Sequence, residues 1–356
     1  MVKDRACQNV QPPRPALSVL IATYNRAALL DRTLRSLLEG VVERPDEIVI
    51  VSGSCDRTPE VVAHHIAAGA PIRLIQVPSV GISASQNAGY PYCRGEIVAT
   101  LDDDVIVSPD WVRRVKEAHV AYPQAGGIGG RTLNEFPDVL TARFEQARAF
   151  DVPGVGGAKP RTASGTKWSA AVPRPEGGVR PVRTVAGVNM SYKRAVMEEV
   201  GSFDESLPAG MDVDYNWRVA RAGYPVLHDP SIVLTHHNRT SVGRMLRQQI
   251  WYGRGYFRTR RKWPDLPSSR IPRDVRGWTN WVKMVLFVVD PFVYHPLHYA
   301  RRAGTPGDSA AFAVLACCAD LCMKAGFLRE AVGAYARRPR ARQQSHRCGP
   351  LRTTPC

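Results

Sequence analysis

Four successive strand–turn–helix units near the start of the chain constrain its fold more than any other feature. Each unit begins with a short apolar run and, in the first three, continues into a helix. The predicted strands are 17–22, 47–51, 72–77 and 97–101, and the first three helices begin near Ala27, Thr58 and Gly81. Such repeats are typical of a parallel sheet with right-handed crossovers. We therefore predict an α/β fold with a mainly parallel central sheet.

Three consecutive carboxylates, Asp102 to Asp104, follow the fourth predicted strand directly. Ligands of parallel α/β sheets bind beyond the carboxyl ends of the strands, which is where this acidic run falls. Three adjacent carboxylates repel one another unless a cation lies among them. The alternative is an acidic turn that caps a helix beginning near Pro109. Three carboxylates after a buried strand favour the metal site.

The turns after these strands exclude several classes of nucleotide-binding protein. None carries the GxGxxG pattern of a dinucleotide dehydrogenase or the GxxxxGK[ST] pattern of a P-loop enzyme. A nucleotide would therefore be held by side chains and a metal ion. The eight cysteines form no CxxC pairs, which argues against a zinc site and indicates a reducing compartment. Because the N-terminus also lacks the apolar core of a signal peptide, we expect a cytoplasmic protein.

The last third of the chain carries the whole excess of positive charge. From Arg239 onward there are 22 Lys and Arg against 6 Asp and Glu, which accounts for the net charge of +16. Such a segment seeks phosphate groups, as in anionic lipids, diphosphate-linked molecules or nucleic acid. We exclude nucleic acid because aromatic residues are not interleaved as stacking platforms. A basic helix is predicted from Ser241 to Lys262.

Two apolar segments follow, at 281–297 and 309–328, and each is nearly long enough to cross a bilayer. Both contain charged residues, which argues against free-standing transmembrane helices. Two interpretations stay open: peripheral helices on the inner face of the membrane, or an ordinary helical packing layer. The expected organisation is a disordered lead (1–15), a catalytic domain (16–238), a basic helical region to which either of these interpretations applies (239–335) and a disordered basic tail (336–356).

A second acidic cluster, Asp212–Val213–Asp214, lies downstream of the sequence Gly201–Ser202–Phe203–Asp204–Glu205. With the earlier motifs it resembles family 2 glycosyltransferases, which have the GT-A fold. The matching pieces run in order along the chain: 23–26, 53–58, 86–89, 94–97, 101–104, 187–190 and 212–214. Each piece alone is weak, but their order and spacing over about Leu17 to His237 are specific. The resemblance implies a nucleotide-sugar-binding half at 16–130 and an acceptor-binding half at 131–238.

The resemblance also implies roles for individual residues. Asp212 would be the catalytic base, Asp102 would face the ribose, and Asp104 would hold Mg²⁺ or Mn²⁺ on the diphosphate, with His236 near the metal. The other residues implied to bind the nucleotide sugar are Thr23, Tyr24, Asn25, Ser52, Gln86, Asn87 and Asp103. Of the three consecutive aspartates, we expect Asp103 to matter least.

The implied reaction is metal-assisted, inverting transfer of a sugar from a nucleotide-diphosphate donor to a hydroxyl acceptor. The acceptor would be lipid-linked or a polysaccharide, and a UDP-sugar is favoured as donor. Three departures weaken the match, since the family usually has Asp at Ser52, Arg at Gln86 and Glu at Met211. They motivate an alternative, a non-catalytic GT-A domain that binds acidic lipid or polymer. A nucleotidyltransferase is a weaker third hypothesis, because no Gly-rich, Lys-bearing loop lies near the N-terminus.

Overall fold

The structure is a computed structural model that describes residues 14–78, 81–147, 178–266, 289, 292 and 306–336. The chain divides into two compact units: Met1–Ser206 with Met211–Asn238, and Leu207–Gly210 with Arg239–Cys356. Most of the predicted N-terminal lead, most of the apolar segment 281–297 and almost all of the C-terminal tail lie outside the described residues.

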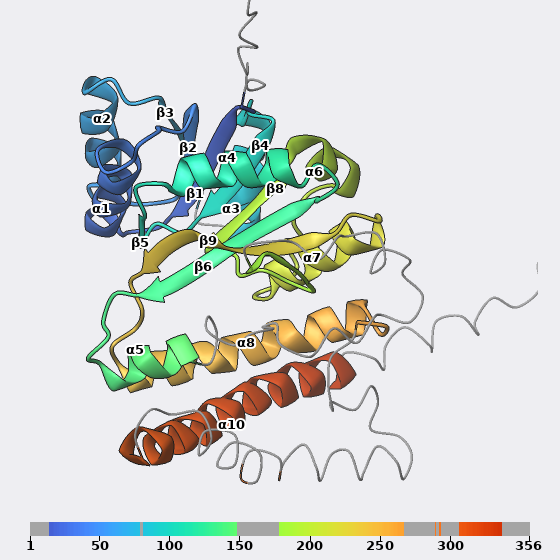
Figure 1. The fold of residues 1–356 in the computed structure, drawn as a ribbon. Coiled ribbons are helices and arrows are strands. Elements are labelled where there is room, and N and C mark those ends of the chain that lie inside the picture. The colour runs from blue at the N-terminus through green and yellow to red at the C-terminus, as the bar shows by residue number, and fades with distance from the viewer. Residues whose placement is uncertain are drawn as a thin grey trace, which may run out of the picture. The chain divides into compact units, whose positions relative to one another are not determined.

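The first half of the first unit is the predicted series of parallel strands and helices. It contains β1 (Leu17–Thr23), α1 (Ala27–Leu38), β2 (Glu47–Ser52), α2 (Thr58–Ala67), β3 (Ile72–Gln76), α3 (Ile82–Gly89), the short 3₁₀ helix η1 (Tyr90–Tyr92) and β4 (Ile97–Leu101). The strands pair in parallel in the order β3-β2-β1-β4. Every predicted strand and helix of this half is confirmed, and the carboxyl ends of its strands share one edge (Figure 1).

The second half completes a mixed sheet. It contains β5 (Val105–Val107), α4 (Trp111–Ala121), β6 (Gly127–Asn134), α5 (Leu140–Glu145), β7 (Arg180–Val182), β8 (Asn189–Lys193), α6 (Arg194–Val200), α7 (Met211–Arg221) and β9 (Val226–His236). The sheet order is β3-β2-β1-β4-β8-β6-β9-β5, and β7 pairs with β9. Strand β8 runs antiparallel to both neighbours, as do β5 and β7 to β9. The α/β class is confirmed, with antiparallel pairings in this half that the sequence analysis did not predict.

Two strands of this half, β6 and β9, lack the uninterrupted apolar runs of β1 to β4, and the structure shows why. Strand β6 has no apolar run because it needs glycines: a Cβ on Gly130 would lie 2.1 Å from the Ile232 carbonyl oxygen. Strand β9 begins at Val226 and so includes Pro230. The register with β6 shifts between Gly130 and Arg131, so Pro230 falls in an irregularity where no ladder hydrogen bond is required.

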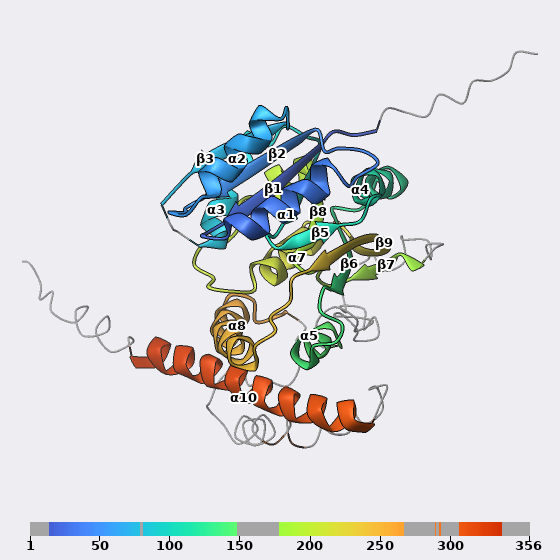
Figure 2. The same ribbon diagram turned by 90° about the vertical axis from the view of Figure 1, so that its left-hand side faces the viewer.

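Alternate side chains of the central strands build a separate apolar core on each face of the sheet. Val19, Ile21, Ile48 and Ile50 pack with α1, α2 and α4, whereas Leu20, Val49 and Val51 pack with α3, α6 and α7. Figure 2 shows the sheet between these helices. Burial on both faces explains why the strands appear in the sequence as continuous apolar runs.

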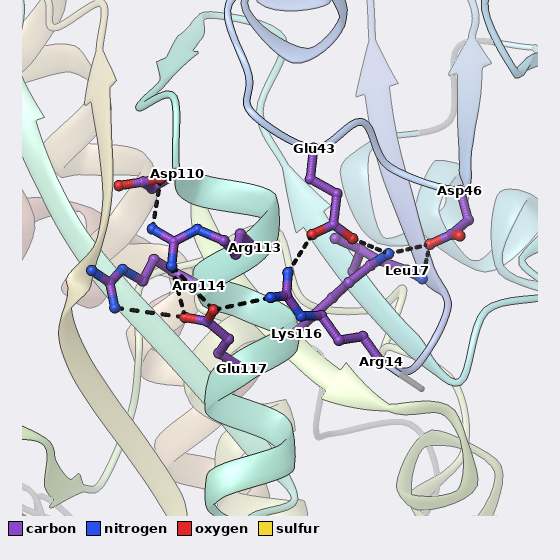
Figure 3. A network of polar contacts seen from close by, with 9 residues as sticks. All are labelled: Arg14, Leu17, Glu43, Asp46, Asp110, Arg113, Arg114, Lys116 and Glu117. Atoms are coloured by element: carbon purple, nitrogen blue, oxygen red, sulfur yellow. Dashed lines mark hydrogen bonds and ion pairs between the residues drawn. The ribbon is translucent and has the colours of Figure 1, made fainter. Parts of the chain in front are cut away.

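An ion-pair network around the buried Lys116 lies at the opposite end of the strands from the carboxyl edge (Figure 3). Lys116 of α4, whose side chain is 5% exposed, contacts Glu43 at 2.8 Å and Asp46 at 2.7 Å. Asp46 also accepts a 2.7 Å hydrogen bond from the backbone N–H of Leu17, the first residue of β1. These pairs anchor α4 to the start of β1, so the network supports the sheet without lying at its ligand-binding edge.

The described part of the second unit contains two long helices, α8 (Val242–Lys262) and α10 (Pro306–Ala336), which lie side by side (Figure 1). They approach closely at glycines: a Cβ on Gly253 would lie 1.8 Å from the Met323 carbonyl oxygen. Glu330 of α10 accepts hydrogen bonds from Arg254 at 3.0 Å and from Arg258 at 2.8 Å. The predicted basic helix is thereby confirmed, and two of its arginines are used within the unit.

Candidate active site

The register of the parallel strands brings three predicted nucleotide-binding residues to one edge. Thr23 ends β1 and pairs with Ser52 at the end of β2. Ile21 of β1 pairs with Leu101 of β4. Two residues further along each strand, this register places Thr23 beside Asp103. The Thr23 hydroxyl accordingly donates a 2.7 Å hydrogen bond to Asp103 Oδ2. The turns after β1, β2 and β4 therefore meet, as the repeated strand–turn–helix pattern indicated.

The pairing of β5 with β9 adds a histidine to the acidic turn. Val105 pairs with His236, so the residue before β5 lies beside the end of β9. Asp102, Asp104 and His236 then present ligand atoms within 4.8 Å of one another. His236 Nε2 lies 3.3 Å from Asp104 Oδ1, and its Nδ1 lies 3.0 Å from Asn238 Oδ1. The structure thus brings together both predicted metal ligands and the predicted ribose-binding aspartate.

The charges in this cluster fit a bound cation. Burial, together with repulsion from Asp104, raises the pKa of Asp102 to about 6. Burial alone would lower the pKa of His236, but Asp104 and Asp102 raise it above its usual value. Both shifts reflect excess negative charge in a site that water reaches poorly. Two carboxylates and one imidazole suit a divalent ion such as Mg²⁺ or Mn²⁺, which would relieve that charge.

Arg26 is the residue of this site to which sequence analysis gave no role. Its Nη1 atom donates to Asp103 Oδ1 at 3.0 Å and to Asp104 Oδ2 at 2.9 Å. Asp103 is buried, with 4% of its surface exposed, and is bound by both Thr23 and Arg26. Asp103 therefore joins the turn after β1 to the acidic turn. The available signal was the position of Arg26 in a turn that had to meet the acidic run.

Asp212, the predicted base, lies in the first turn of α7 and is held by backbone groups. Its Oδ2 accepts a 3.3 Å hydrogen bond from the Gly187 N–H, and its Oδ1 accepts one of 2.9 Å from Val213. The Thr100 hydroxyl donates to the Gly187 carbonyl at 3.4 Å, so the segment that holds Asp212 borders the end of β4. Burial raises the pKa of Asp212 even though these N–H donors oppose the shift.

The neighbouring carboxylate on α7 has a different environment. Asp214 is fully buried and accepts a 3.0 Å hydrogen bond from Arg218 Nε. Arg218 also donates to the carbonyl oxygens of Val200 and Ser202, which ties α7 to the turn before it. Asp214 is therefore occupied by a structural ion pair, which leaves Asp212 as the carboxylate of this helix that is suited to proton transfer.

The turn after β1 also contacts the turn after β2. Asn25 has φ +53°, a left-handed conformation that asparagine tolerates better than most residues. Its N–H donates to Ser54 Oγ and its side-chain oxygen accepts from the Cys55 N–H, both at 2.8 Å. Tyr24 is 52% exposed at this edge, whereas Ser52 is 3% exposed. Tyr24 has the accessibility expected of a residue that packs on a nucleotide.

Gln86 and Asn87 on α3 have different surroundings. Gln86 is 1% exposed, and its Oε1 has no hydrogen-bond partner among the described residues. Asn87 donates to the Phe203 carbonyl at 2.9 Å and to Glu205 at 2.8 Å, and it accepts from the Phe203 N–H at 2.9 Å. Asn87 thus binds the 203–205 turn with its whole amide, and its nucleotide-binding role stays a prediction.

His237 holds the backbone of the acidic turn beside the cluster of Asp102, Asp104 and His236. Its N–H donates to the Asp104 carbonyl oxygen at 2.9 Å. Its ring Nδ1 lies 2.7 Å from Glu135 Oε2, and its ring packs edge-on against Phe136. Glu135 is also paired with Arg32 of α1. These contacts hold the end of β9 against the acidic turn, a role that required the β6 and β9 strands to be known.

Comparison with known proteins agrees with this fold. Residues 18–163 match the family described as "Glycosyl transferase family 2". Glycosyltransferase AglE of Haloferax volcanii is 26% identical over 325 residues, which cover 88% of this chain and 95% of that protein. Validoxylamine A glucosyltransferase of Streptomyces hygroscopicus subsp. jinggangensis is 30% identical over 234 residues, 60% of this chain and 53% of that protein.

Among solved structures, a mannosyltransferase from Pyrobaculum calidifontis (PcManGT), determined with GDP-Man and Mn²⁺, has a TM-score of 0.55 at 18% identity. The match covers 90% of this chain and 88% of that chain. The fold is therefore that of the GT-A glycosyltransferases, as predicted. The part of the chain that matches glycosyl transferase family 2 is residues 18–163, and the chain is a glycosyltransferase. It spans nearly all of AglE but about half of validoxylamine A glucosyltransferase.

Proposed function

We propose that the protein transfers a sugar from a nucleotide-diphosphate donor to a hydroxyl acceptor by a single, inverting displacement assisted by a divalent metal ion. The observation that carries this proposal is the cluster of Asp102, Asp104 and His236 at the carboxyl edge of the sheet. A separate carboxylate, Asp212, lies outside that cluster on a segment that borders β4. A site for the leaving group and a separate base are the two parts that a direct displacement needs.

The protein residues divide the work between the two partners of the reaction. Asp104 and His236 would hold Mg²⁺ or Mn²⁺, which offsets the negative charge that develops on the leaving diphosphate. Asp102 would bind the ribose. Asp212 would take the proton of the acceptor hydroxyl as it attacks the sugar, and its raised pKa makes it a stronger base than an ordinary aspartate. Attack from the face opposite the diphosphate inverts the anomeric carbon.

The acidic cluster supports the proposed donor class, whereas the nucleobase and the sugar of the donor are narrower proposals. PcManGT was solved with GDP-Man, and the earlier motifs favour a UDP-sugar. We propose a nucleotide-diphosphate sugar, with uridine and guanosine as the two bases to test first. A lipid-linked or polysaccharide hydroxyl is proposed as acceptor. Acceptor choice is assigned to residues 131–183 and the last third of the chain, and residues 148–177 lie outside the described part.

A donor panel tests the proposed function directly. The full chain would be incubated with UDP- and GDP-sugars and Mn²⁺, and release of nucleoside diphosphate would be measured with and without a chelator. We expect turnover with one donor, lost with the chelator and restored by added Mn²⁺ or Mg²⁺. Turnover that is indifferent to the chelator would contradict metal assistance. Nucleotide binding without turnover against any acceptor class would instead favour the non-catalytic alternative.

We also propose that the second unit contacts a membrane surface peripherally. One described helix, 308–334 within α10, is long and apolar enough to cross a membrane by length and composition. Its exposed apolar residues, Val314, Leu321, Leu328 and Val332, are spaced by seven, seven and four positions and so form one stripe. The two charged residues in mid-helix, Asp320 and Lys324, pair with each other at 2.8 Å. An apolar stripe within a basic unit suits an anionic lipid surface.

Vesicle binding tests this contact. The protein should co-sediment with vesicles of phosphatidylcholine and phosphatidylglycerol, and less with phosphatidylcholine alone, because the basic unit is attracted to anionic headgroups. Raising the salt concentration should weaken binding by screening. Val314→Glu with Val332→Glu should reduce binding, whereas Val42→Glu in the first unit, which is 71% exposed, serves as a matched control. Equal binding to neutral and anionic vesicles would refute the electrostatic part.

A further inference from the structure

Arg26, the last residue of the matching piece 23–26, presents a cation at the acidic turn, and the proposed chemistry gives it no role. The backbone around it is fixed, because its carbonyl oxygen accepts the N–H groups of Leu29 and Leu30 at 3.0 Å as α1 begins. The side chain reaches from this point to the turn after β4. There, a single nitrogen, Nη1, binds both Asp103 and Asp104. Arg26 is thus held at both ends while 41% of its side chain remains exposed.

The guanidinium has donors left over. An arginine carries five N–H donors in a planar fork, and the contacts to Asp103 and Asp104 use those of Nη1 alone. Among the described residues, Nε and Nη2 make no hydrogen bond. Asp103 is an anchor rather than a ligand, since it is 4% exposed and its other oxygen accepts from Thr23. Arg26 can therefore keep Asp103 when a metal ion occupies Asp104.

The charge balance of the proposed complex calls for a second cation. Three aspartates surround a site that would receive a diphosphate, and one divalent ion leaves net negative charge there. Gln86, at the position where a cation would be expected beside the phosphates, is neutral and buried. The fork of an arginine matches phosphate oxygens better than any other side chain, and the pair is charge-assisted.

We propose that Arg26, anchored on Asp103, binds the donor's diphosphate through its remaining N–H groups and acts as a phosphate-binding residue next to the metal. This inference rests on the proposed function, because it takes a nucleoside diphosphate as the ligand. Arg26 then has two partners in sequence: it pairs with Asp104 before the metal and donor bind, and with phosphate oxygens afterwards.

Binding of nucleotides without a sugar tests the proposal apart from catalysis. Titration calorimetry would compare UDP with UMP and GDP with GMP, each with Mg²⁺ and again with a chelator. Arg26→Gln should weaken the nucleoside diphosphate that the wild-type protein binds by about 10- to 100-fold, the usual range for a lost charged hydrogen bond. The matching monophosphate should change much less. Part of the loss should persist with the chelator, because Arg26 contacts the phosphate itself.

Two further variants make the result decisive. Arg35→Gln removes the same charge from α1 at a residue paired with Asp31, and it should leave nucleotide binding unchanged. Arg26→Lys keeps the charge and loses the fork, so its affinity should fall between those of the wild type and Arg26→Gln, and it also serves if Arg26→Gln fails to fold. Equal losses for diphosphate and monophosphate, or a change in Mg²⁺ affinity alone, would overturn the inference. Wild-type protein that binds neither diphosphate would overturn the proposed function as well.

Discussion

Asp212→Asn is expected to lower the rate of sugar transfer by about 10²- to 10⁴-fold, the range that a positioned general base contributes. The amide keeps the shape of the carboxylate and can still accept a hydrogen bond from Gly187 or Val213, which hold Asp212 now. What it loses is the ability to take the acceptor's proton. Because Asp212 lies outside the metal cluster, donor binding should stay close to that of the wild type. Transfer kinetics and donor titration together measure both effects.

Asp214→Asn is the matched comparison, since it is the same substitution two residues along α7. Asp214 is fully buried and paired with Arg218. Replacing its carboxylate should therefore lower the free energy of unfolding by about 1–3 kcal/mol. Transfer per folded molecule should change little. Full turnover by Asp212→Asn would contradict the assignment of Asp212 as the catalytic base. Inactivity of a well-folded Asp214→Asn protein would move that role to Asp214.

The pH dependence of transfer gives a second check on Asp212. A base works only when deprotonated, so activity must fall as the pH drops through its pKa. Burial raises the pKa of Asp212, so at saturating metal the acid limb should lie above the ordinary aspartate value of about 4. The residual activity of Asp212→Asn should lack this limb. An unchanged acid limb in that variant would assign it to another group.

The sequence predicted the part of the fold that is apolar on both faces. Strands β1 to β4 are continuous apolar runs because Leu20 packs on one face of the sheet while Val19 and Ile21 pack on the other. Strand β6 escaped detection because close packing requires glycine at positions such as Gly130. The start of β9 was hidden by Pro230, which lies where the register with β6 shifts. In both cases a tertiary contact determined the residue type. The sequence of the strand therefore lacks the regular apolar pattern by which a strand is recognised.

The site could be predicted where the residue type alone implies the chemistry. It was harder to predict where the pairing of distant strands determines which side chains meet. Consecutive aspartates after a buried strand indicated a cation, and the structure groups Asp102 and Asp104 with His236. The contact of Arg26 with Asp103 depends on the register between β1 and β4, which no local pattern gives. Likewise, the amide of Asn87 is used by the 203–205 turn, more than a hundred residues away.

Asp104→Asn is expected to weaken binding of Mn²⁺ in the absence of donor by at least about 100-fold. Losing a second-shell partner of a metal site typically costs 10- to 100-fold, and losing a charged ligand should cost no less. The two oxygens of Asp104 lie near nitrogen atoms of basic side chains, His236 Nε2 at 3.3 Å and Arg26 Nη1 at 2.9 Å. Removing the negative charge leaves His236 and Asp102 as the other members of the cluster among the described residues. Titration of Mn²⁺ followed by electron paramagnetic resonance measures the affinity without any turnover.

Asp103→Asn separates charge in the acidic turn from direct ligation. Its carboxylate is turned toward Thr23 and Arg26 and is not a member of the ligand cluster. We therefore expect Asp103→Asn to lower the unfolding free energy and to leave Mn²⁺ affinity nearly unchanged, although it removes the same charge one residue away. If both substitutions weakened Mn²⁺ equally, general electrostatics would explain the site. If only Asp103→Asn did so, Asp103 rather than Asp104 would be the metal ligand of this turn.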